Sequence, residues 1–140
     1  MAILDLYNRI GVVHDLAPAA RTATANSTGI DRTAFEGSAD ALVAVLDVGA
    51  WTDGTHTFKL QDSPDNSTWT DVATTYLQGS FTAISGTGQQ NKAQKVGYLG
   101  TQRYVRAVDT VSGATTGAIY GLVWIVGGAH YLPTGSPNQP

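Results

Sequence analysis

The segment His56-Thr57-Phe58-Lys59-Leu60-Gln61 alternates between ring or aliphatic side chains and polar ones. Successive residues of a β-strand point to opposite faces, so the histidine, phenylalanine and leucine share one face. The threonine, lysine and glutamine share the other face, where they can contact water. This pattern predicts a half-buried strand, and the chain has no sustained helical period that would favour an α-helix.

Other strand-like runs recur on both sides of this segment, bounded by Gly, Asp, Asn and Ser. They lie at residues 22–28, 41–48, 68–73, 94–99, 103–108 and 118–126. A chain of about seven or eight short strands is typical of a two-sheet sandwich or a jelly roll.

Two of these runs, residues 41–48 and 118–126, are nearly all apolar. Such a run predicts a strand covered on both faces. For residues 118–126, which we expect at the centre of a sheet, another subunit could supply the second cover. The short connection at residues 100–102 predicts a hairpin between the runs at 94–99 and 103–108.

The segments outside these runs suggest the domain organisation of the 140-residue chain. We expect one all-β domain, a β-sandwich or jelly roll, at residues 21–132. Residues 1–20 are interpreted as an extended N-terminal arm or a first strand, and residues 133–140 as an extended Pro-rich tail. The Gly-rich stretch at residues 79–93 predicts a long loop that is functional or mobile.

The composition restricts the function classes. The chain has no cysteine, which excludes disulfides and thiol chemistry, and its net charge is −3 with only 14% charged residues. Nucleic-acid binders carry clustered Lys and Arg, so no nucleic acid is expected as a partner. No apolar stretch approaches the ~20 residues of a membrane helix and no secretory signal is found, so we expect synthesis in the cytoplasm and no membrane partner.

The sequence contains no pattern of catalytic residues, so we expect a non-enzymatic protein without a cofactor. The three histidines, His14, His56 and His130, are far apart and none forms a His-x-x-x-His pair. No Gly-x-Ser-x-Gly element is present for a hydrolase, and residues 85–92 lack the Gly-Lys-Ser/Thr end of a phosphate loop.

Four oxygen donors cluster around one turn: Asp62, Asp65, Asn66 and Asp71. These side chains suit calcium, but their spacing is not that of an EF-hand loop. Asp and Asn are also the ordinary residues of tight turns. We therefore interpret the cluster as a turn and expect no metal.

The run at residues 103–108 carries two arginines and a tyrosine. Strand geometry places Tyr104 and Arg106 on one face and Arg103 on the other. Two arginines in so apolar a run predict pairing with acids at a rim or a subunit contact. The aromatic residues of the chain suit either a sugar-binding face or a core and subunit interface.

Two segments are similar to a known group of phage proteins. One spans residues 54–72, and the other contains the run Gly97-Tyr98-Leu99-Gly100-Thr101-Gln102-Arg103-Tyr104-Val105-Arg106, followed by the apolar run and residues 127–133. Together they resemble small head decoration, or cement, proteins of tailed bacteriophages. The resemblance spans about residues 40–133, and the Gly-Tyr-to-Arg run is its most specific part.

The resemblance implies a β-sandwich or jelly-roll protein on the capsid exterior of a virion, bound to the major capsid protein. It also implies a homotrimer that stabilises contacts between capsomers. The residues expected at the capsid or subunit interface are Leu4, Leu6, Tyr7, Ile10, Val12, Tyr98, Arg103, Tyr104 and Arg106.

Two other functions fit parts of the sequence. Residues 65–69 and 103–106 also resemble the Asp-Gly-x-x-Trp and Tyr-Val-Arg pattern of discoidin-like carbohydrate-binding modules, although no glycine follows Asp65. A phage tail or baseplate component would share the same composition.

Overall fold

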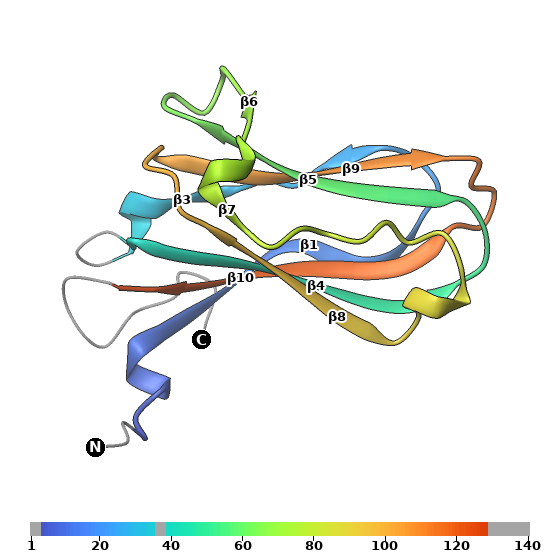
Figure 1. The fold of residues 1–140 in the computed structure, drawn as a ribbon, viewed down its shortest axis with the longest axis horizontal. Helices are drawn as coiled ribbons and strands as arrows, with labels where there is room; N and C mark the ends of the chain where they lie inside the picture. Colours follow the sequence, from blue (N-terminus) through green and yellow to red (C-terminus); the bar gives the residue numbers. More distant parts are fainter. Residues whose placement is uncertain (1–3, 36–38, 129–140) are drawn as a thin grey trace.

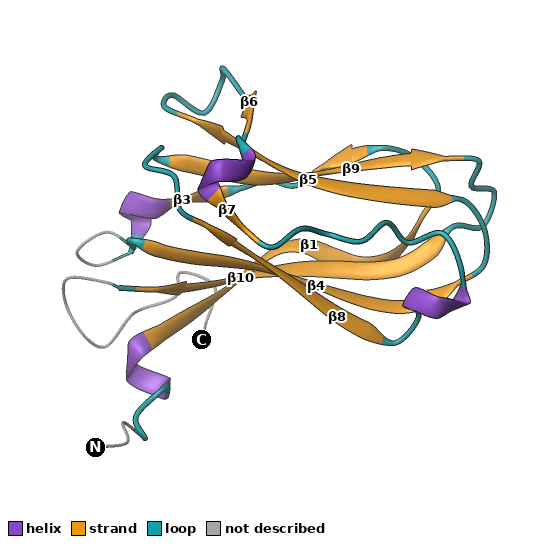
Figure 2. Ribbon diagram, viewed as in Figure 1, coloured by secondary structure: helices purple, strands orange, loops and turns teal. Residues whose placement is uncertain are grey.

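The computed structural model describes residues 4–35 and 39–128, in which strands form two antiparallel sheets packed face to face (Figure 1). The described residues contain no α-helix, only four short 3-10 turns, which Figure 2 shows in purple. The fold is therefore all-β with the architecture of a β-sandwich. The predicted tail at residues 133–140 lies outside the described residues.

The first sheet has the strand order β1-β10-β4-β8-β7. Its strands are β1 (Ile10–Arg21), β10 (Ala118–Gly127), β4 (Ala41–Trp51), β8 (Lys92–Tyr98) and β7 (Leu77–Gln78). The second sheet has the order β2-β9-β5-β6, and β3 also pairs with β9. Its strands are β2 (Ala25–Asn26), β9 (Tyr104–Ser112), β5 (Thr55–Ser63), β6 (Thr70–Asp71) and β3 (Ile30–Asp31).

Residues 56–61 lie in β5, as their alternation predicts. His56, Phe58 and Leu60 are buried, and Thr57 and Lys59 are exposed. The runs at residues 41–48, 94–99, 103–108 and 118–126 are also strands, β4, β8, β9 and β10. The weaker runs at residues 22–28 and 68–73 contribute only the two-residue strands β2 and β6. Residues 10–21 also belong to the first sheet, since β1 pairs with β10 from Ile10 to Arg21.

The predicted hairpin at residues 100–102 is wrong, because β8 and β9 belong to different sheets. The connection instead crosses the sandwich around the side chain of Tyr98. A Cβ atom on Gly100 would lie 2.3 Å from the Tyr98 hydroxyl, and the backbone N–H of Gln102 donates to that hydroxyl at 3.2 Å. Only a residue without a side chain fits so close to the buried ring.

The loop at residues 79–91 also differs from a free surface loop. Ile84, in its middle, is fully buried and exchanges two backbone hydrogen bonds of 2.9 Å with His56. The loop thus contributes a side chain to the core and does not lie entirely on the surface.

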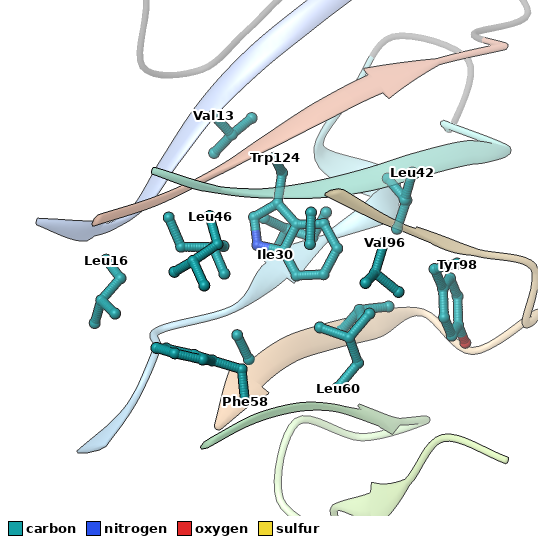
Figure 3. Packing of buried hydrophobic residues seen from close by; sticks show 14 of the residues in the cluster. Val13, Leu16, Ile30, Leu42, Leu46, Phe58, Leu60, Val96, Tyr98 and Trp124 are labelled. Carbon is teal, nitrogen blue, oxygen red and sulfur yellow. The ribbon is translucent and has the colours of Figure 1, made fainter. Parts of the chain in front are cut away.

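The core lies between the two sheets, with Trp124 in the middle of the packed side chains (Figure 3). Phe58 and Leu60 of the second sheet point toward it from the opposite side. The indole N–H of Trp124 donates to Asp15 at 2.7 Å, so its one polar atom is satisfied despite full burial.

The chain itself covers only one face of residues 41–48 and 118–126, so the prediction of a strand covered on both faces is wrong for residues 41–48. For residues 118–126 the second cover was expected from another subunit, and this stays a prediction. In β4, Leu42, Ala44, Leu46 and Val48 are buried, whereas Val43 and Val45 are half-buried and Asp47 is exposed. In β10 the side chains also alternate between buried and partly accessible positions. Each strand has only one face in the core, so the first sheet turns apolar side chains outward.

Candidate protein interface

The outward face of the first sheet carries an apolar patch that crosses three strands, which we call the β-face. Strand register aligns Val12 with Ile125 and Ile125 with Val43, and it aligns Val123 with Val45 in the next row. All five side chains are half-buried, because short aliphatic groups on a flat sheet cover one another only in part. Contiguous outward apolar groups of this kind mark interaction surfaces.

Polar residues border one end of the β-face. His14 continues the row of Val123 on β1, and Lys95 continues the row of Val45 on β8. Asp47, two residues along β4 from Val45, is exposed on the same face. An apolar centre with a polar rim is the usual anatomy of a protein–protein contact.

A shallow hollow of about 400 Å³ lies next to the centre of the β-face. Its lining includes Leu16, Pro18, Val45, Gly121 and Val123. The hollow arises where β1 loses its register with β10 around Leu16 and passes over Gly121. A Cβ atom on Gly121 would lie 2.9 Å from Pro18 and 3.0 Å from the Leu16 carbonyl oxygen, so this crossing requires glycine.

A second apolar feature precedes β1. The arm, residues 4–9, ends in the 3-10 turn η1 (Tyr7–Arg9), and none of the η1 residues is buried. Leu4, Leu6 and Tyr7 are 92%, 62% and 84% exposed. The turn is held locally, since Asp5 accepts hydrogen bonds from the backbone and side-chain amides of Asn8 at 3.2 and 2.9 Å.

The arm and the β-face lie on the same side of the molecule. In Figure 1 the arm leaves the end of the first sheet and lies on the side away from the second sheet. One partner surface can therefore contact both features. Of the predicted interface residues, Leu4, Leu6 and Tyr7 lie on this arm, and Ile10 and Val12 lie on the adjoining part of β1.

Tyr98 does not belong to a surface. Its side chain is 1% exposed, and its hydroxyl donates to Asp62 at 2.7 Å. Burial, together with this hydrogen bond, raises the pKa of Tyr98 above its usual range. The prediction of Tyr98 as an interface residue is corrected: it closes the core at the crossing between the sheets.

The other three predicted residues lie on the second sheet. Arg103 precedes β9 and forms a bidentate ion pair with Asp31, with N–O distances of 3.0 and 2.7 Å. Its guanidinium also stacks over the Tyr104 ring at 4.8 Å. The hydrogen bonds from Arg103 lower the pKa of Asp31 to about 2.

Among the described residues Arg106 pairs with no acid, and an acid partner at a subunit contact stays a prediction. Its guanidinium donates twice to the side-chain oxygen of Gln61, at 3.0 and 2.7 Å, and stacks over the Trp69 ring at 4.3 Å. Lys59 and Gln61 in turn donate to Asp71 at 2.8 and 2.7 Å. On the outward face of the second sheet, the long polar side chains of Lys59, Gln61 and Arg106 are thus joined with Asp71 in one network.

The turn with four oxygen donors also uses its groups internally. The Asp65 carboxylate accepts backbone N–H bonds from Ser67 and Thr68 at 2.9 and 2.7 Å, which lowers its pKa below the usual range. In residues 4–35 and 39–128, no three His, Cys, Asp or Glu side chains come together as metal ligands. Within the same described part, no helix is long and apolar enough to span a bilayer.

The sequence-predicted residues therefore separate into two surfaces and one core position. The members of the β-face other than Val12, namely Val43, Val45, Val123 and Ile125, were not among them. The signal that points to them is the continuous apolar character of residues 41–48 and 118–126, which exceeds what a one-sided strand needs.

No protein-family model matches this chain, and no curated protein sequence matches it either. The resemblance to phage head decoration proteins therefore stays a prediction from the two quoted segments.

Proposed function

We propose that this chain is a structural virion protein that binds the outside of a tailed-phage capsid and stabilises contacts between capsomers. The observation that carries the proposal is the β-face with its exposed apolar arm on the same side of the molecule. The resemblance of residues 54–72 and 97–106 to decoration proteins gives the class of partner, the major capsid protein.

The mode of action is binding linkage. A protein that binds only the assembled shell stabilises that shell by its own binding free energy. A rigid sandwich supplies a preformed apolar surface, and the arm adds contacts that become ordered on binding. Neither step needs a reacting group or a cofactor.

The proposed homotrimer is taken from the resemblance to decoration proteins. In such a trimer each subunit presents one surface to a different surface of the next subunit, and three of these heterologous contacts form a closed ring when the rotation is 120°. This arrangement leaves the β-face free to bind the shell. In this arrangement the arm of each subunit reaches beyond its own sandwich toward a neighbour or the capsid.

The test is co-sedimentation of the full chain with shells assembled from the major capsid protein, followed by cryo-electron microscopy of the decorated particle. We expect saturable binding and density on the capsid exterior with the first sheet facing the shell. Density on the tail or baseplate alone would replace the head assignment. A monomeric protein without affinity for any phage particle would overturn the proposal.

A second candidate function, carbohydrate binding, is favoured by one observation. Trp69 and Arg106, which come from the two parts of the discoidin-like pattern, lie together on the second sheet with 4.3 Å between guanidinium and ring. An aromatic ring beside a hydrogen-bonding side chain is a common sugar contact. Glycan-array binding that is lost in Trp69→Ala would support this function, and shell binding without any glycan signal would reject it.

A further inference from the structure

Three buried polar side chains form a chain between the two sheets. His56 on β5, Tyr120 on β10 and Asp109 on β9 are 0%, 1% and 2% exposed. The Tyr120 hydroxyl oxygen lies 3.1 Å from Nδ1 of His56 and is also hydrogen-bonded to the Asp109 carboxyl group. On the far side of the ring, Nε2 of His56 lies 3.3 Å from the carbonyl oxygen of Asp53.

The number of protons in this chain follows from donor and acceptor counting. A carbonyl oxygen only accepts, so Nε2 of His56 must carry a hydrogen to bond Asp53. Tyr120 has a single O–H and faces two partners. If it donates to an ionised Asp109, Nδ1 of His56 must also carry a hydrogen, and the ring is a cation.

In the other arrangement every group is neutral. The Asp109 carboxyl O–H donates to the Tyr120 oxygen, and the Tyr120 O–H donates to Nδ1 of His56. Both arrangements hold the same total number of protons, and they differ only in where one proton resides. Any further proton gained or lost leaves two donors or two acceptors facing each other.

Burial favours the neutral arrangement. Removing two charges from water destabilises the fold by more than their mutual attraction stabilises it, unless every lone pair is hydrogen-bonded. Oδ1 of Asp109 is buried and has no hydrogen-bond partner among the described residues, which suits a carboxylic acid better than a carboxylate. In the same direction, burial raises the pKa of Asp109.

Two other charged groups face this chain. The guanidinium of Arg21, on β1, lies 5.9 Å from the centre of the Tyr120 ring, and one of its amino groups donates to the Ala17 carbonyl oxygen at 2.7 Å. The Asp53 carboxylate points away, because it accepts the backbone N–H groups of Thr115, Thr116 and Gly117. Neither group supplies the missing partner of Oδ1.

We propose that His56, Tyr120 and Asp109 share one proton and act as a pH-sensitive lock between the two sheets. Tyr120 belongs to the first sheet and the other two residues to the second, so the hydrogen bonds of the lock tie the sheets together. The lock is independent of the partner that the domain binds.

The pH dependence follows from proton counting in the folded and unfolded states. In an unfolded chain an aspartate loses its proton near pH ~3.9 and a histidine near ~6.5. Above about pH 7.5, one unit beyond the histidine value, the unfolded pair therefore holds almost no proton, whereas the folded lock still holds one. Stability must then fall as the pH rises, by ~10-fold in the folding equilibrium constant per pH unit, until the folded lock loses its proton.

The test compares chemical unfolding of the full chain with that of Asp109→Asn between pH ~7.5 and ~9, where an unfolded histidine is already neutral. Asparagine keeps the shape, and its amide donates to Tyr120 without a proton to lose. We expect the ~10-fold decrease per pH unit in the unmodified protein and a flat profile in the variant. Equal profiles, or a flat profile in the unmodified protein, would overturn the proposal.

Tyr98→Phe is the matched control. It removes another buried tyrosine hydroxyl, the one that bonds Asp62, and leaves the lock intact. This variant should be less stable at every pH and keep the slope of the unmodified protein; a flat slope here would attribute the pH dependence to general loosening and reject the lock.

A spectroscopic measurement serves if Asp109→Asn does not fold. Nitrogen NMR of the unmodified protein at pH 7 should show His56 as the neutral Nε2–H form with a bare Nδ1. A His56 ring protonated on both nitrogens at that pH would overturn the neutral lock.

Discussion

The two sheets of this sandwich are built on the same alternation, yet their outward faces differ. On the first sheet the outward positions at the centre of β4 and β10 are valine and isoleucine, whose side chains form no hydrogen bonds. On the second sheet the outward positions of β5 are threonine, lysine and glutamine, and the longer two are bonded to neighbouring strands. The core needs only one face of each sheet, so the outward chemistry is free to serve another purpose.

This difference indicates which side of the molecule is available for a partner. A partner on the second sheet would have to replace hydrogen bonds that already exist within the chain, and such an exchange adds little binding free energy. Apolar groups on the first sheet gain ~25 cal/mol for every Å² removed from water. The first sheet is therefore the better docking surface, and the arm beside it extends that surface.

The strongest way to break this comparison is a charge at the centre of the β-face. Val123→Asp places a carboxylate where a partner would have to bury it unpaired. Central contacts of this kind cost ~2 kcal/mol or more, so the dissociation constant for capsid shells should rise by at least ~30-fold. Co-sedimentation over a range of protein concentrations measures the change.

Thr110→Asp is the matched control, because Thr110 is an exposed outward position on β9 of the second sheet. We expect shell binding to stay within about twofold and thermal unfolding to change little, as for most surface substitutions. Equal losses of binding in the two variants would show that the outward faces are not functionally distinct.

The next effect concerns the arm. Replacing Leu4, Leu6 and Tyr7 with serine removes large side chains that are mostly exposed, so the midpoint of thermal unfolding should not move. Shell binding should fall by ~10-fold, since each buried aliphatic side chain contributes ~1.5 kcal/mol or more and ordering the arm offsets part of this gain. Calorimetry and co-sedimentation of the same preparation separate the two quantities.

Leu99→Ser controls for the loss of an exposed leucine, because Leu99 is 52% exposed in the crossing between the sheets. It should bind shells like the unmodified protein. Deleting residues 1–16 is a less specific experiment, because it also removes Val13 and Leu16 from the core. That deletion should lower both stability and attachment.

Local sequence patterns predict more of the fold than of the interface. Alternation in residues 56–61 predicts β5 and its buried face, because period-two geometry depends only on neighbouring residues. The crossing at residues 99–103 could not be predicted, since a short connection between two strands suits a hairpin until the buried ring of Tyr98 is known. Tertiary packing decides between a hairpin and a crossing, and the local sequence does not show which one forms.

The interface was predicted only in part for a similar reason. Leu4, Leu6 and Tyr7 stand out as apolar residues in a polar segment, and the structure leaves them exposed. The apolar run that contains Val43 and Val45 predicts a strand covered on both faces, because sequence cannot distinguish a second layer of the same chain from a partner protein. Arg103 and Arg106 suggest a functional surface in the sequence, but Asp31 and Gln61 of the same chain already bind their guanidinium groups.

A smaller effect is expected on the second sheet. Arg106→Ala removes the stack on Trp69 and the two hydrogen bonds to Gln61. An exposed cation–π pair contributes ~0.5–1 kcal/mol, and hydrogen bonds to a charged group contribute ~1.5 kcal/mol or more when shielded from water and less when partly exposed, as here, so the free energy of unfolding should fall by ~1–2 kcal/mol. Shell binding should not change, and a loss of binding without a loss of stability would place the partner on the second sheet.

The smallest effect is a pH dependence at the edge of the second sheet. Asp31 has a folded-state pKa of about 2, below its ordinary value of 3.8, mainly because of the hydrogen bonds from Arg103. A lowered pKa stabilises the fold above pH 3.8, and this stabilisation is lost as the pH falls toward 2. The pair is partly exposed, with Arg103 at 50%, so the contribution is below ~1 kcal/mol.

Arg103→Gln should therefore flatten the acid side of the stability profile slightly, as measured by urea unfolding at intervals between pH 2 and 5. Lys59→Gln is the matched comparison, because its pair with Asp71 lies on the same sheet and is exposed on both sides. Since a fully solvated pair contributes less than a bidentate one, the Arg103 variant should show the larger change. A larger change in the Lys59 variant would mean that the bidentate geometry of the Arg103 pair adds no stability. It would also mean that Lys59 contributes more than Arg103 to the stability of the second sheet.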